Sequence, residues 1–572
     1  MSAYTRSEHL RALWPWLPLW AAAALLAIFS HGPMPLFSTR TLAVAWEMWS
    51  RHHWLVPYIN GEPYSEKVPL LFWMIHAGWF VFGVNDVWPR VLEVAFGAIQ
   101  LMLAAALARR LFPDRPWIAR ATPWMLMALS YAFLFGLQIM YEVLLAAWVL
   151  GALLCLTPSP RRAEPRWLLF GLLLGAGLLT KGPVMLLHVA FPWLLGPLWS
   201  EWAREHRARW YGRGLLAVLL GLAILLAWAL PAGFSGGEAY RHRLFFTQTA
   251  GRVVDGVAPP DTLQNHAQPF WWYLLCLPVL MFPLSAWPRA TAALAMLRRP
   301  LEPGLRFLLC WLLPNFVAFS LVSGKQAYYP LPEFGGGVML IAAAVALLRE
   351  RHPRLGANGW LGTWPLGVGG LLLAALLFAL PDLVASGRLH GEWLDAASLY
   401  SRSFSVVFLL LGLLLLLRGR GEMRRLAFAG LAGTLAMNTL FTLTLWPNYD
   451  LRPATDLLRA ADGSGRAIGI VGGYDGQFHF AGRLTRPLAR LQYDASLQAF
   501  AQAHPDGLVV THLNHPGADA MRYALLVQPF RSSWLVVWPA ATLASLQAGH
   551  APPEPAQPPR FYPRAGGLRA SP

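Results

Sequence analysis

The chain carries little charge for its length. Only 13% of its 572 residues are charged, against about 25% in a typical soluble domain, whereas 56% are hydrophobic. This composition excludes an ordinary soluble domain and indicates a polytopic membrane protein. The net charge of +17 does not indicate nucleic-acid binding, because arginine collects in the inner-face loops of membrane proteins. No nucleic-acid partner is therefore expected.

Cysteine is scarce, and several motifs are missing. The three cysteines, Cys155, Cys276 and Cys310, fall inside apolar runs, so no disulfide outside the membrane is expected. No small-residue cleavage site follows the first apolar run, which predicts a retained span. The sequence contains no Walker A lysine motif and no glycine-rich strand-to-helix turn, which argues against a nucleotide substrate. It also contains no internal repeat, which argues against a transporter.

Long apolar runs dominate what is present. A spanning helix needs about 20 mostly apolar residues, and about 17 is the lower limit. Thirteen candidate runs lie near residues 14–30, 88–108, 118–136, 140–157, 167–180, 182–199, 214–233, 269–288, 306–323, 330–348, 359–380, 403–417 and 426–446. A further run, at 70–83, is short for a span and favours a helix lying in the membrane interface.

The distribution of arginine tests this arrangement. The N-terminus is placed in the cytoplasm and the run at 70–83 on the outer surface. Six arginine-rich loops then fall inside, at 109–120, 158–166, 201–213, 289–306, 349–354 and 418–425. If the run at 70–83 spanned the membrane, every later loop would change sides and the bias would reverse. The positive-inside rule therefore predicts thirteen spans with the C-terminus outside.

The outer side is predicted to hold two long loops and a small domain. The loops cover residues 31–87 and 234–268, and the stretch TRTLAVAWEMWSRHHW in the first predicts either a surface helix or a packing helix. Beyond 449, helix and strand patterns alternate in DLLRAADGSGRAIGIVGG, SLQAFAQAHPDGLVVTHL and SSWLVVWP. We predict a membrane domain over 1–448, an α/β domain over 449–550 and a disordered proline-rich tail over 551–572.

Lysine is rarer than any other charged residue type. The chain has only Lys67, Lys181 and Lys325, and all three are predicted at outer helix edges. A lysine ammonium is a compact point charge that suits a phosphate, although three such positions can also arise by chance. Other ionisable or phenolic residues expected at the same edge are Tyr64, Glu66, Glu142, Arg252, His266, Tyr328 and Tyr329. Such a set fits a lipid phosphate or diphosphate.

These residues lie in motifs that resemble a known family. The motifs are WLVPYINGEPYSEKVPLLFW, LLTKGP, TQTAGRVV followed by HAQPFWWYLL, and SGKQAYYPLP. In this order they resemble the GT-C-fold polyprenyl-phosphate-sugar glycosyltransferases, the family of the lipid A aminoarabinose transferases and the protein mannosyltransferases. The resemblance covers most of residues 1–450. It implies a GT-C-like fold with about thirteen spans, periplasmic surface helices and a small C-terminal α/β domain.

The resemblance also implies roles for individual residues. Tyr64, Lys67 and Arg252 match residues that bind the carrier phosphate, and Tyr329 matches the tyrosine of a lysine–tyrosine–Leu-Pro motif to which Lys325 contributes. The catalytic candidates are Glu142, at the family's aspartate position in the fourth span, and Glu66 in the first outer loop. Each of these residues can instead be an ordinary anchor at a helix end. For Lys181 and His266 we favour a structural role, at a Gly-Pro break and at a helix cap.

One position departs from the family pattern. The family carries an Asp-Glu pair in its first outer loop, and here Phe37 and Ser38 occupy those positions. Phenylalanine neither takes a proton nor binds a metal, and the nearest acid, Glu47, is nearly three helical turns further on. Three explanations remain open. Glu142 or Glu66 serves as the base, or the acceptor is an already ionised phosphate that needs little help, or the protein binds lipid without turning it over.

The sequence therefore predicts a multi-pass glycosyltransferase of the bacterial inner membrane. It would move a sugar, with inversion, from polyprenyl phosphate to lipid A or to another envelope glycan or protein, with its active face and C-terminal domain in the periplasm. The alternative is a degenerate, non-catalytic lipid-phosphate-binding or flippase-like protein. No cofactor is expected, and a divalent metal at Glu66 with His266 stays open. The identities of the sugar and the acceptor are not determined.

Overall fold

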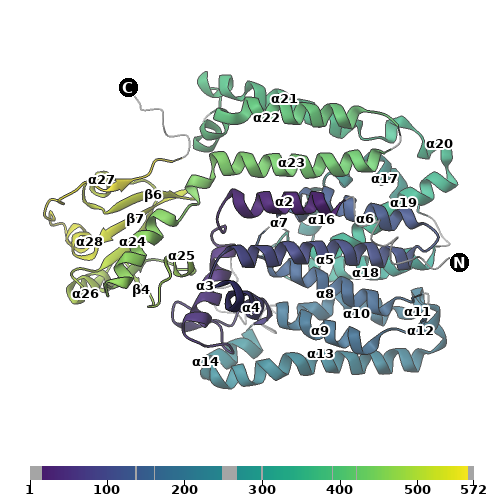
Figure 1. The fold of residues 1–572 in the computed structure, drawn as a ribbon, viewed down its shortest axis with the longest axis horizontal. Helices are drawn as coiled ribbons and strands as arrows, with labels where there is room; N and C mark the ends of the chain where they lie inside the picture. Colours follow the sequence, from purple (N-terminus) through teal and green to yellow (C-terminus); the bar gives the residue numbers. More distant parts are fainter. Residues whose placement is uncertain are drawn as a thin grey trace. The chain divides into compact units, whose positions relative to one another are not determined.

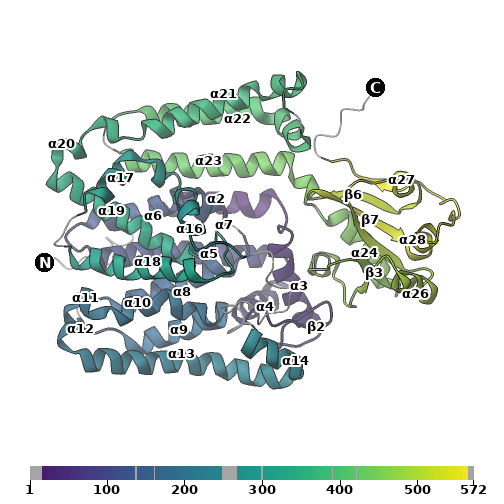
Figure 2. The ribbon, with the colours of Figure 1, turned by 180° about the vertical axis from the view of Figure 1, so that it is seen from behind.

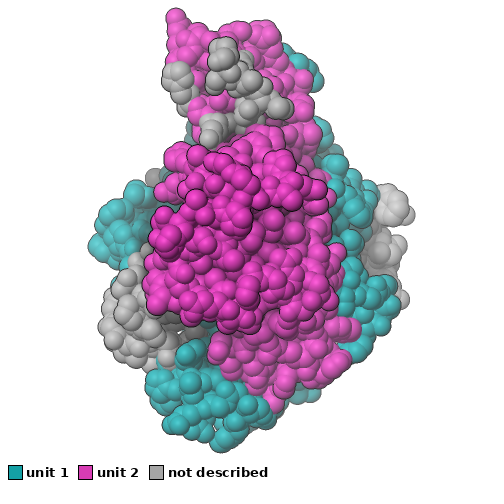
Figure 3. Space-filling model, turned by 90° about the vertical axis from the view of Figure 1, so that its left-hand side faces the viewer, with its two compact units in different colours: residues 1–29, 65–375, 406–437 teal, residues 30–64, 376–405, 438–572 magenta. Residues whose placement is uncertain are grey.

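The computed structural model describes residues 16–135, 138–159, 162–247, 267–297, 301–389, 391–419 and 421–564. The chain divides into two compact units, which Figure 3 colours separately. Unit 1 contains residues 1–29, 65–375 and 406–437, and unit 2 contains residues 30–64, 376–405 and 438–572. The expected domains were continuous along the chain, whereas unit 2 combines the first outer loop with the C-terminal region.

Long apolar helices form most of the fold (Figures 1 and 2). Seven in the described part are long and apolar enough to cross a membrane: α5 (Val87–Leu111), α13 (Arg207–Ser235), α18 (Pro303–Leu321), α19 (Phe334–Arg351) with the preceding turn η4 (Leu331–Glu333), α21 (Trp364–Ala385), α22 (Glu392–Leu416) and α23 (Glu422–Thr444). Five shorter apolar helices are α2 (Leu17–Ser30), α4 (Leu70–Phe82), α8 (Tyr141–Leu156), α9 (Trp167–Lys181) and α10 (Val184–Leu194). The protein is a multi-pass membrane protein, and the number thirteen stays a prediction.

Short helices connect these elements. They are α6 (Pro116–Ala128), α7 (Ser130–Phe135), α11 (Gly196–Trp199), α12 (Glu201–Glu205), α14 (Gly237–His242), η1 (Arg243–Thr247), α16 (Trp272–Leu280), η3 (Leu284–Ala286), α17 (Pro288–Ala295), α20 (Pro353–Gly356) and η5 (Gly359–Leu361). The run at 269–288, predicted as one span, is broken into α16 and η3. Pro283 lies at this break and has no backbone N–H to continue the helix.

Glycines allow the helices of unit 1 to pack closely. A Cβ atom on Gly171 of α9 would lie 2.8 Å from the carbonyl oxygen of Ala217 on α13. A Cβ atom on Gly430 of α23 would lie 2.5 Å from the carbonyl oxygen of Ala128 on α6. Small residues are used in this way where helices associate by van der Waals contact in a membrane. Larger side chains at these two positions would separate the helix pairs.

Ion pairs join the arginine-rich loops that the sequence assigns to one side of the membrane. Arg115 lies 2.7 Å from Glu302 and 2.8 Å from Glu350. Glu422 lies 2.8 Å from Arg289 and 3.6 Å from Arg349. Arg213 pairs with Glu164. Each of the six loops is thus paired with at least one other, which is what we expect if all six lie on the same side of the membrane.

In unit 2, the first outer loop forms a helix and a hairpin. Helix α3 (Phe37–Ser50) is buried on most of its sides, as a packing helix is. The hairpin pairs β1 (Tyr58–Ile59) with β2 (Glu62–Pro63) across a turn at Asn60 and Gly61. Asn60 and Gly61 have φ of 51° and 83°, in the left-handed region that asparagine and glycine tolerate best.

The C-terminal part of unit 2 is a six-stranded sheet in the order β4-β3-β5-β7-β6-β8. Its strands are β3 (Ile468–Val471), β4 (Ala489–Leu491), β5 (Leu508–Leu513), β6 (Leu526–Phe530), β7 (Ser533–Pro539) and β8 (Arg560–Phe561). Strand β3 is parallel to β4 and β5, β7 is antiparallel to β5 and β6, and β8 is parallel to β6. Strand β8 lies in the segment that was expected to be disordered.

Alternating residues place one hydrophobic core on each face of the sheet. Val510 and Leu535 belong to the core that also contains Leu458 of α24 (Arg452–Gly463). Val509 and Val536 belong to the core on the other face, with residues of α26 (Ala495–Ala503) and α28 (Ala540–Gln547). The remaining short elements are η6 (Trp446–Asn448), α25 (His479–Gly482) and α27 (Ala518–Tyr523). The sequence predicted β3, β5 and β7 and missed β4, β6 and β8.

Candidate functional site

The first residues of α8 lie at the centre of the candidate site in unit 1. Glu142 is buried, and its Oε1 accepts a hydrogen bond of 2.6 Å from Nζ of Lys181, at the end of α9. Removing Lys181 would leave the buried carboxylate of Glu142 without its counter-ion, a change that typically costs about 3 to 5 kcal/mol. Lys181, for which the sequence favoured a purely structural role, is therefore electrostatically joined to the predicted catalytic acid.

Aromatic rings surround the Lys181 ammonium. Its Nζ lies 4.4 Å from the ring centroid of Tyr329 and 6.0 Å from that of Tyr328. The preceding residue, Thr180, is buried and accepts a hydrogen bond of 2.9 Å from the indole of Trp148 on α8. The end of α9 is therefore fixed against α8. This arrangement brings together Glu142, Lys181 and Tyr329, of which the sequence selected the first and the last.

A second lysine contacts the residue just before Glu142. The ammonium of Lys67 lies 5.3 Å from the ring centroid of Tyr141, and Tyr141 is buried. Lys67 and Lys181 thus contact two consecutive residues of α8, although 114 positions separate them along the chain. The arrangement offers two ammonium groups and phenol rings near one buried carboxylate, which suits an anionic ligand of more than one negative charge.

Lys325 is placed differently from the other two lysines. It is only 3% exposed, and its Nζ donates a hydrogen bond of 2.7 Å to the carbonyl oxygen of Gln268. An isolated antiparallel β-bridge between Ala267 and Gly324 joins the same two segments. This contact holds the segment before Tyr328 to the residues that precede α16. Its predicted role in binding phosphate directly stays a prediction.

The remaining predicted site residues divide between the two units. Glu66 is partly buried in unit 1, and Tyr64 is buried in unit 2, where its backbone N–H donates to the carbonyl of Pro57 at 2.8 Å. Arg252 and His266 lie outside the described residues. Within the described ranges, no group of three or more His, Cys, Asp or Glu side chains is arranged to hold a metal ion.

Phe37 and Glu47, the two residues at the departure from the family pattern, have clear positions in unit 2. Phe37 begins α3 and is 48% exposed. Glu47 is only 2% exposed, and its carboxylate accepts hydrogen bonds from the backbone N–H groups of Asn60 and Gly61, the latter at 2.9 Å. The nearest acid to the substituted pair is therefore used to close the turn of the β1–β2 hairpin.

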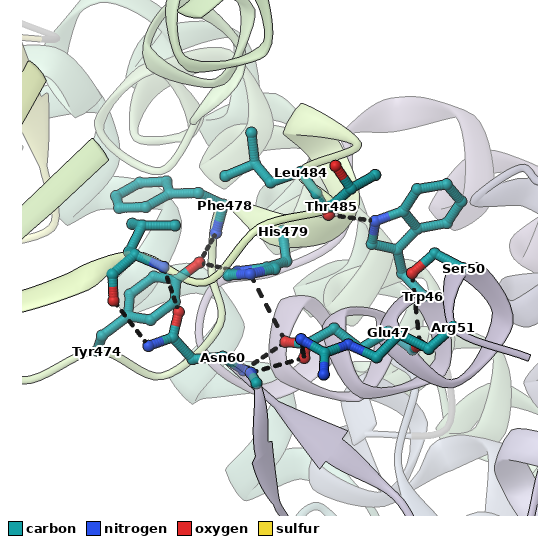
Figure 4. Close-up of polar contacts among 12 residues, drawn as sticks. Trp46, Glu47, Ser50, Arg51, Asn60, Tyr474, Phe478, His479, Leu484 and Thr485 are labelled. Carbon is teal, nitrogen blue, oxygen red and sulfur yellow. Dashed lines mark hydrogen bonds and ion pairs between the residues drawn. The ribbon is translucent and has the colours of Figure 1, made fainter. Parts of the chain in front are cut away.

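Figure 4 shows that Glu47 belongs to a larger buried cluster, which we call the latch: Glu47, Asn60, Tyr474 and His479. Nε2 of His479 lies 3.6 Å from Glu47, and its Nδ1 lies 2.6 Å from the hydroxyl of Tyr474. The side chain of Asn60 makes two hydrogen bonds with the backbone of Leu488, of 3.0 and 2.8 Å. The latch joins the first outer loop to the C-terminal domain.

Burial shifts the titration of two groups in the latch. It raises the pKa of Glu47 above its ordinary value, against the opposing effect of the two backbone donors and Arg51. It lowers the pKa of His479 to about 4, and the positive charge of Arg51 acts in the same direction. Glu47 is thus enclosed and committed to structural contacts, so a role as general base does not fit it.

Sequence reasoning missed three polar residues inside the apolar helices. His188 of α10, Asn315 of α18 and Glu333 of η4 are buried together, and His188 lies 2.6 Å from Glu333. A signal was present, because each lies within or at the edge of a predicted span, where polar groups are costly and usually functional.

Comparisons with known proteins agree with the motif resemblance. Residues 66–228 match the family model of dolichyl-phosphate-mannose-protein mannosyltransferase. Two relatives are named undecaprenyl phosphate-alpha-4-amino-4-deoxy-L-arabinose arabinosyl transferase. The one from Pseudomonas paraeruginosa is 34% identical over 371 residues, which are 62% of this chain and 63% of that protein. The one from Pectobacterium atrosepticum is 28% identical over 348 residues, 59% of this chain and 60% of that protein.

The fold is shared with solved structures of ArnT from Cupriavidus metallidurans. The apo structure matches with a TM-score of 0.69 and 19% identity, covering 94% of this chain and 99% of that one. The structure bound to undecaprenyl phosphate gives a TM-score of 0.65 with the same identity and coverage. The chain therefore has the fold that the resemblance to the GT-C glycosyltransferases implied. The aligned segments span about 60–63% of the length of the two curated relatives.

Proposed function

We propose that this chain is a glycosyltransferase that moves a sugar from a polyprenyl-phosphate donor to lipid A or another acceptor of the cell envelope. The observation that carries the proposal is that Lys67 and Lys181 contact consecutive residues at the start of α8, and that Lys181 also faces the ring of Tyr329. When the sugar departs, negative charge develops on the lipid phosphate, and fixed cations stabilise it most where water is excluded. The names of the relatives support undecaprenyl phosphate as the carrier.

We place this chemistry at the periplasmic face of a bacterial inner membrane. The arginine-rich loops that meet through Arg115 and Glu422 fit a cytoplasmic side. A donor that arrives already linked to a lipid phosphate explains why the sequence contains no nucleotide-binding motif. Because the donor sugar is already activated by its lipid phosphate, we propose that the reaction needs no cofactor. Sugar transfer is to be measured after divalent ions are removed with a chelator. Loss of transfer would indicate a metal, for which Glu66 is the candidate ligand.

Glu142 is proposed to orient the acceptor. Nζ of Lys181 donates a hydrogen bond of 2.6 Å to its carboxylate and so fixes the direction of the carboxylate. The enclosure of Glu47 leaves Glu142 and Glu66 as the candidate acids. An acceptor phosphate, which is ionised at neutral pH, would need orientation more than deprotonation. Inversion at the sugar carbon remains an expectation from the family resemblance.

The proposal is tested by replacing the phosphate-binding cations. Lys67→Ala and Arg252→Ala should each abolish transfer in membranes supplied with undecaprenyl-phosphate-linked aminoarabinose and lipid A. Arg209→Ala provides a matched control, because Arg209 is exposed in a predicted cytoplasmic segment. Wild-type rates of transfer in both the Lys67→Ala and the Arg252→Ala variants, at equal protein levels, would contradict the proposal.

A second candidate function is a non-catalytic lipid-phosphate-binding protein. It is favoured by one observation, the phenylalanine at position 37 where the family has an acid. Such a protein would retain affinity for undecaprenyl phosphate through Lys67 and Lys181 and would show no transfer with any donor. The Phe37→Asp variant separates the two functions.

A further inference from the structure

A buried polar cluster lies inside unit 1, formed by His188, Asn315 and Glu333. Nδ1 of His188 lies 2.6 Å from Oε1 of Glu333, so these two groups share a hydrogen bond, whichever of them carries the proton. The amide of Asn315 donates to the same Oε1 at 3.0 Å and to the backbone carbonyl of His188 at 3.2 Å. His188 and Asn315 are 0% exposed and Glu333 is 8% exposed.

Stability alone does not explain this cluster. Within the described part of the chain, Nε2 of His188, Oδ1 of Asn315 and Oε2 of Glu333 are buried without a hydrogen-bond partner. A partly satisfied polar network in an apolar interior is less stable than well-packed apolar side chains of the same size. The three helical elements would therefore pack at least as firmly with apolar residues here, which points to a role other than stability.

Glu333 ends the segment that carries the two tyrosines beside Lys181. At the other end of this segment, Lys325 donates to the carbonyl of Gln268 at 2.7 Å, and the Tyr273 hydroxyl donates to the carbonyl of Gln326 at 2.9 Å. Between these ends, backbone hydrogen bonds of 3.1 Å from Tyr329 to Gln326 and from Leu331 to Tyr328 fold the segment into tight turns. The segment from 325 to 333 is thus fastened at both ends by buried polar contacts.

We infer that His188 and Asn315 are positioning residues for the donor site, acting through Glu333 on Tyr329 and Lys181. Among the described residues, neither His188 nor Asn315 forms a hydrogen bond or ion pair with Lys181 or Glu142, so their effect passes along the fastened segment. Tight turns transmit a displacement of Glu333 to Tyr329, four residues earlier. This inference rests on the proposed function, because it assumes that Tyr329 and Lys181 face the lipid phosphate.

The test uses Asn315→Leu in the full-length protein in detergent. Leucine has the same branching and the same number of side-chain heavy atoms as asparagine and lacks its unpaired oxygen, so the thermal midpoint should stay the same or rise. Binding of undecaprenyl phosphate should weaken and kcat should fall, by about tenfold to a hundredfold, the range seen when a reacting group is displaced by about 1 Å. The control is Thr122→Val, another buried polar residue in the same unit that bonds only within its own helix.

A double-mutant cycle separates positioning from general damage. If Asn315 acts through Tyr329, then Asn315→Leu should add little to the loss already caused by Tyr329→Phe, because coupled residues are not additive. Additive losses, or a fall in thermal midpoint that parallels the fall in kcat, would overturn the inference. Glu333→Leu is the second variant if Asn315→Leu does not accumulate, and it should show the same binding defect.

The outcome is distinguishable from failure of the proposed function. If Lys67→Ala is inactive and Asn315→Leu matches the wild type in binding and kcat, the positioning role alone is wrong. If Lys67→Ala and Lys181→Ala both retain full transfer, the proposed donor site is wrong, and the positioning role that depends on it falls with it.

Discussion

Lys181 illustrates how the meaning of a single residue depends on what surrounds it. In the sequence it lies at a Gly-Pro break, which favours a structural role. In the structure its ammonium bonds to Glu142 and faces the ring of Tyr329. No spacing along the chain relates positions 142, 181 and 329, because they come from two different helices and a separate turn. The residue types indicated the chemistry of the site, and the tertiary contacts show which of these residues lie together.

Phe37 gives the clearest prediction at the residue scale. Its side chain is 48% exposed at the start of α3, so Phe37→Asp buries no charge, and an acid in the first helical turn is favourable. We expect the natural protein to transfer sugar and the variant to change its rate only modestly, because Glu142 or an ionised acceptor serves in place of an aspartate. Transfer assays of both proteins check this. Activity found in the aspartate variant alone would identify the natural chain as a degenerate enzyme.

At the scale of elements, the latch explains how α3 and the two-residue strands β1 and β2 are held. Such short strands are not stable by themselves. Glu47 closes their turn, Asn60 bonds to Leu488, and the indole of Trp46 on α3 donates to the carbonyl of Leu484 at 2.8 Å. The first outer loop therefore takes its conformation from a domain that begins about 400 residues later in the chain.

Acid should weaken the latch through His479, whose pKa burial lowers to about 4. The unfolded chain takes up a proton on this imidazole below about pH 6.5, and the folded chain does so only near pH 4. The free energy of unfolding therefore falls as the pH drops through this window. Glu47 has the opposite effect on the free energy of unfolding, because burial raises its pKa. The charge of Arg51 further lowers the pKa of His479, and that of Asp462 raises it.

Comparison with His479→Gln isolates the contribution of the histidine. The thermal midpoint of the full-length protein should fall further between about pH 7 and about pH 5 in the wild type than in this variant. Differential scanning fluorimetry in detergent measures both. Equal falls in the two proteins would show that His479 does not carry the acid sensitivity.

For the whole molecule, the arginine distribution predicts which segments face which side. In a cysteine-free background, a membrane-impermeant thiol reagent should label Glu62→Cys, an exposed position of the hairpin, in spheroplasts whose inner membrane is intact. It should label Arg209→Cys, exposed in a predicted cytoplasmic segment, only after the membrane is permeabilised. Labelling of both positions in intact spheroplasts, or in the reverse order, would contradict the predicted topology.

The sequence by itself determined the membrane class, three of the six strands of the C-terminal sheet and the resemblance that implied the fold, and its charge bias predicts the sidedness. These properties follow from hydropathy, charge bias and short motifs, each of which is written locally along the chain. The tertiary structure alone decided the pairing of Lys181 with Glu142, the enclosure of Glu47 and the burial of His188 with Asn315 and Glu333. Each of these depends on side chains that only folding brings together, and burial then limits each polar group to the partners that the fold places beside it.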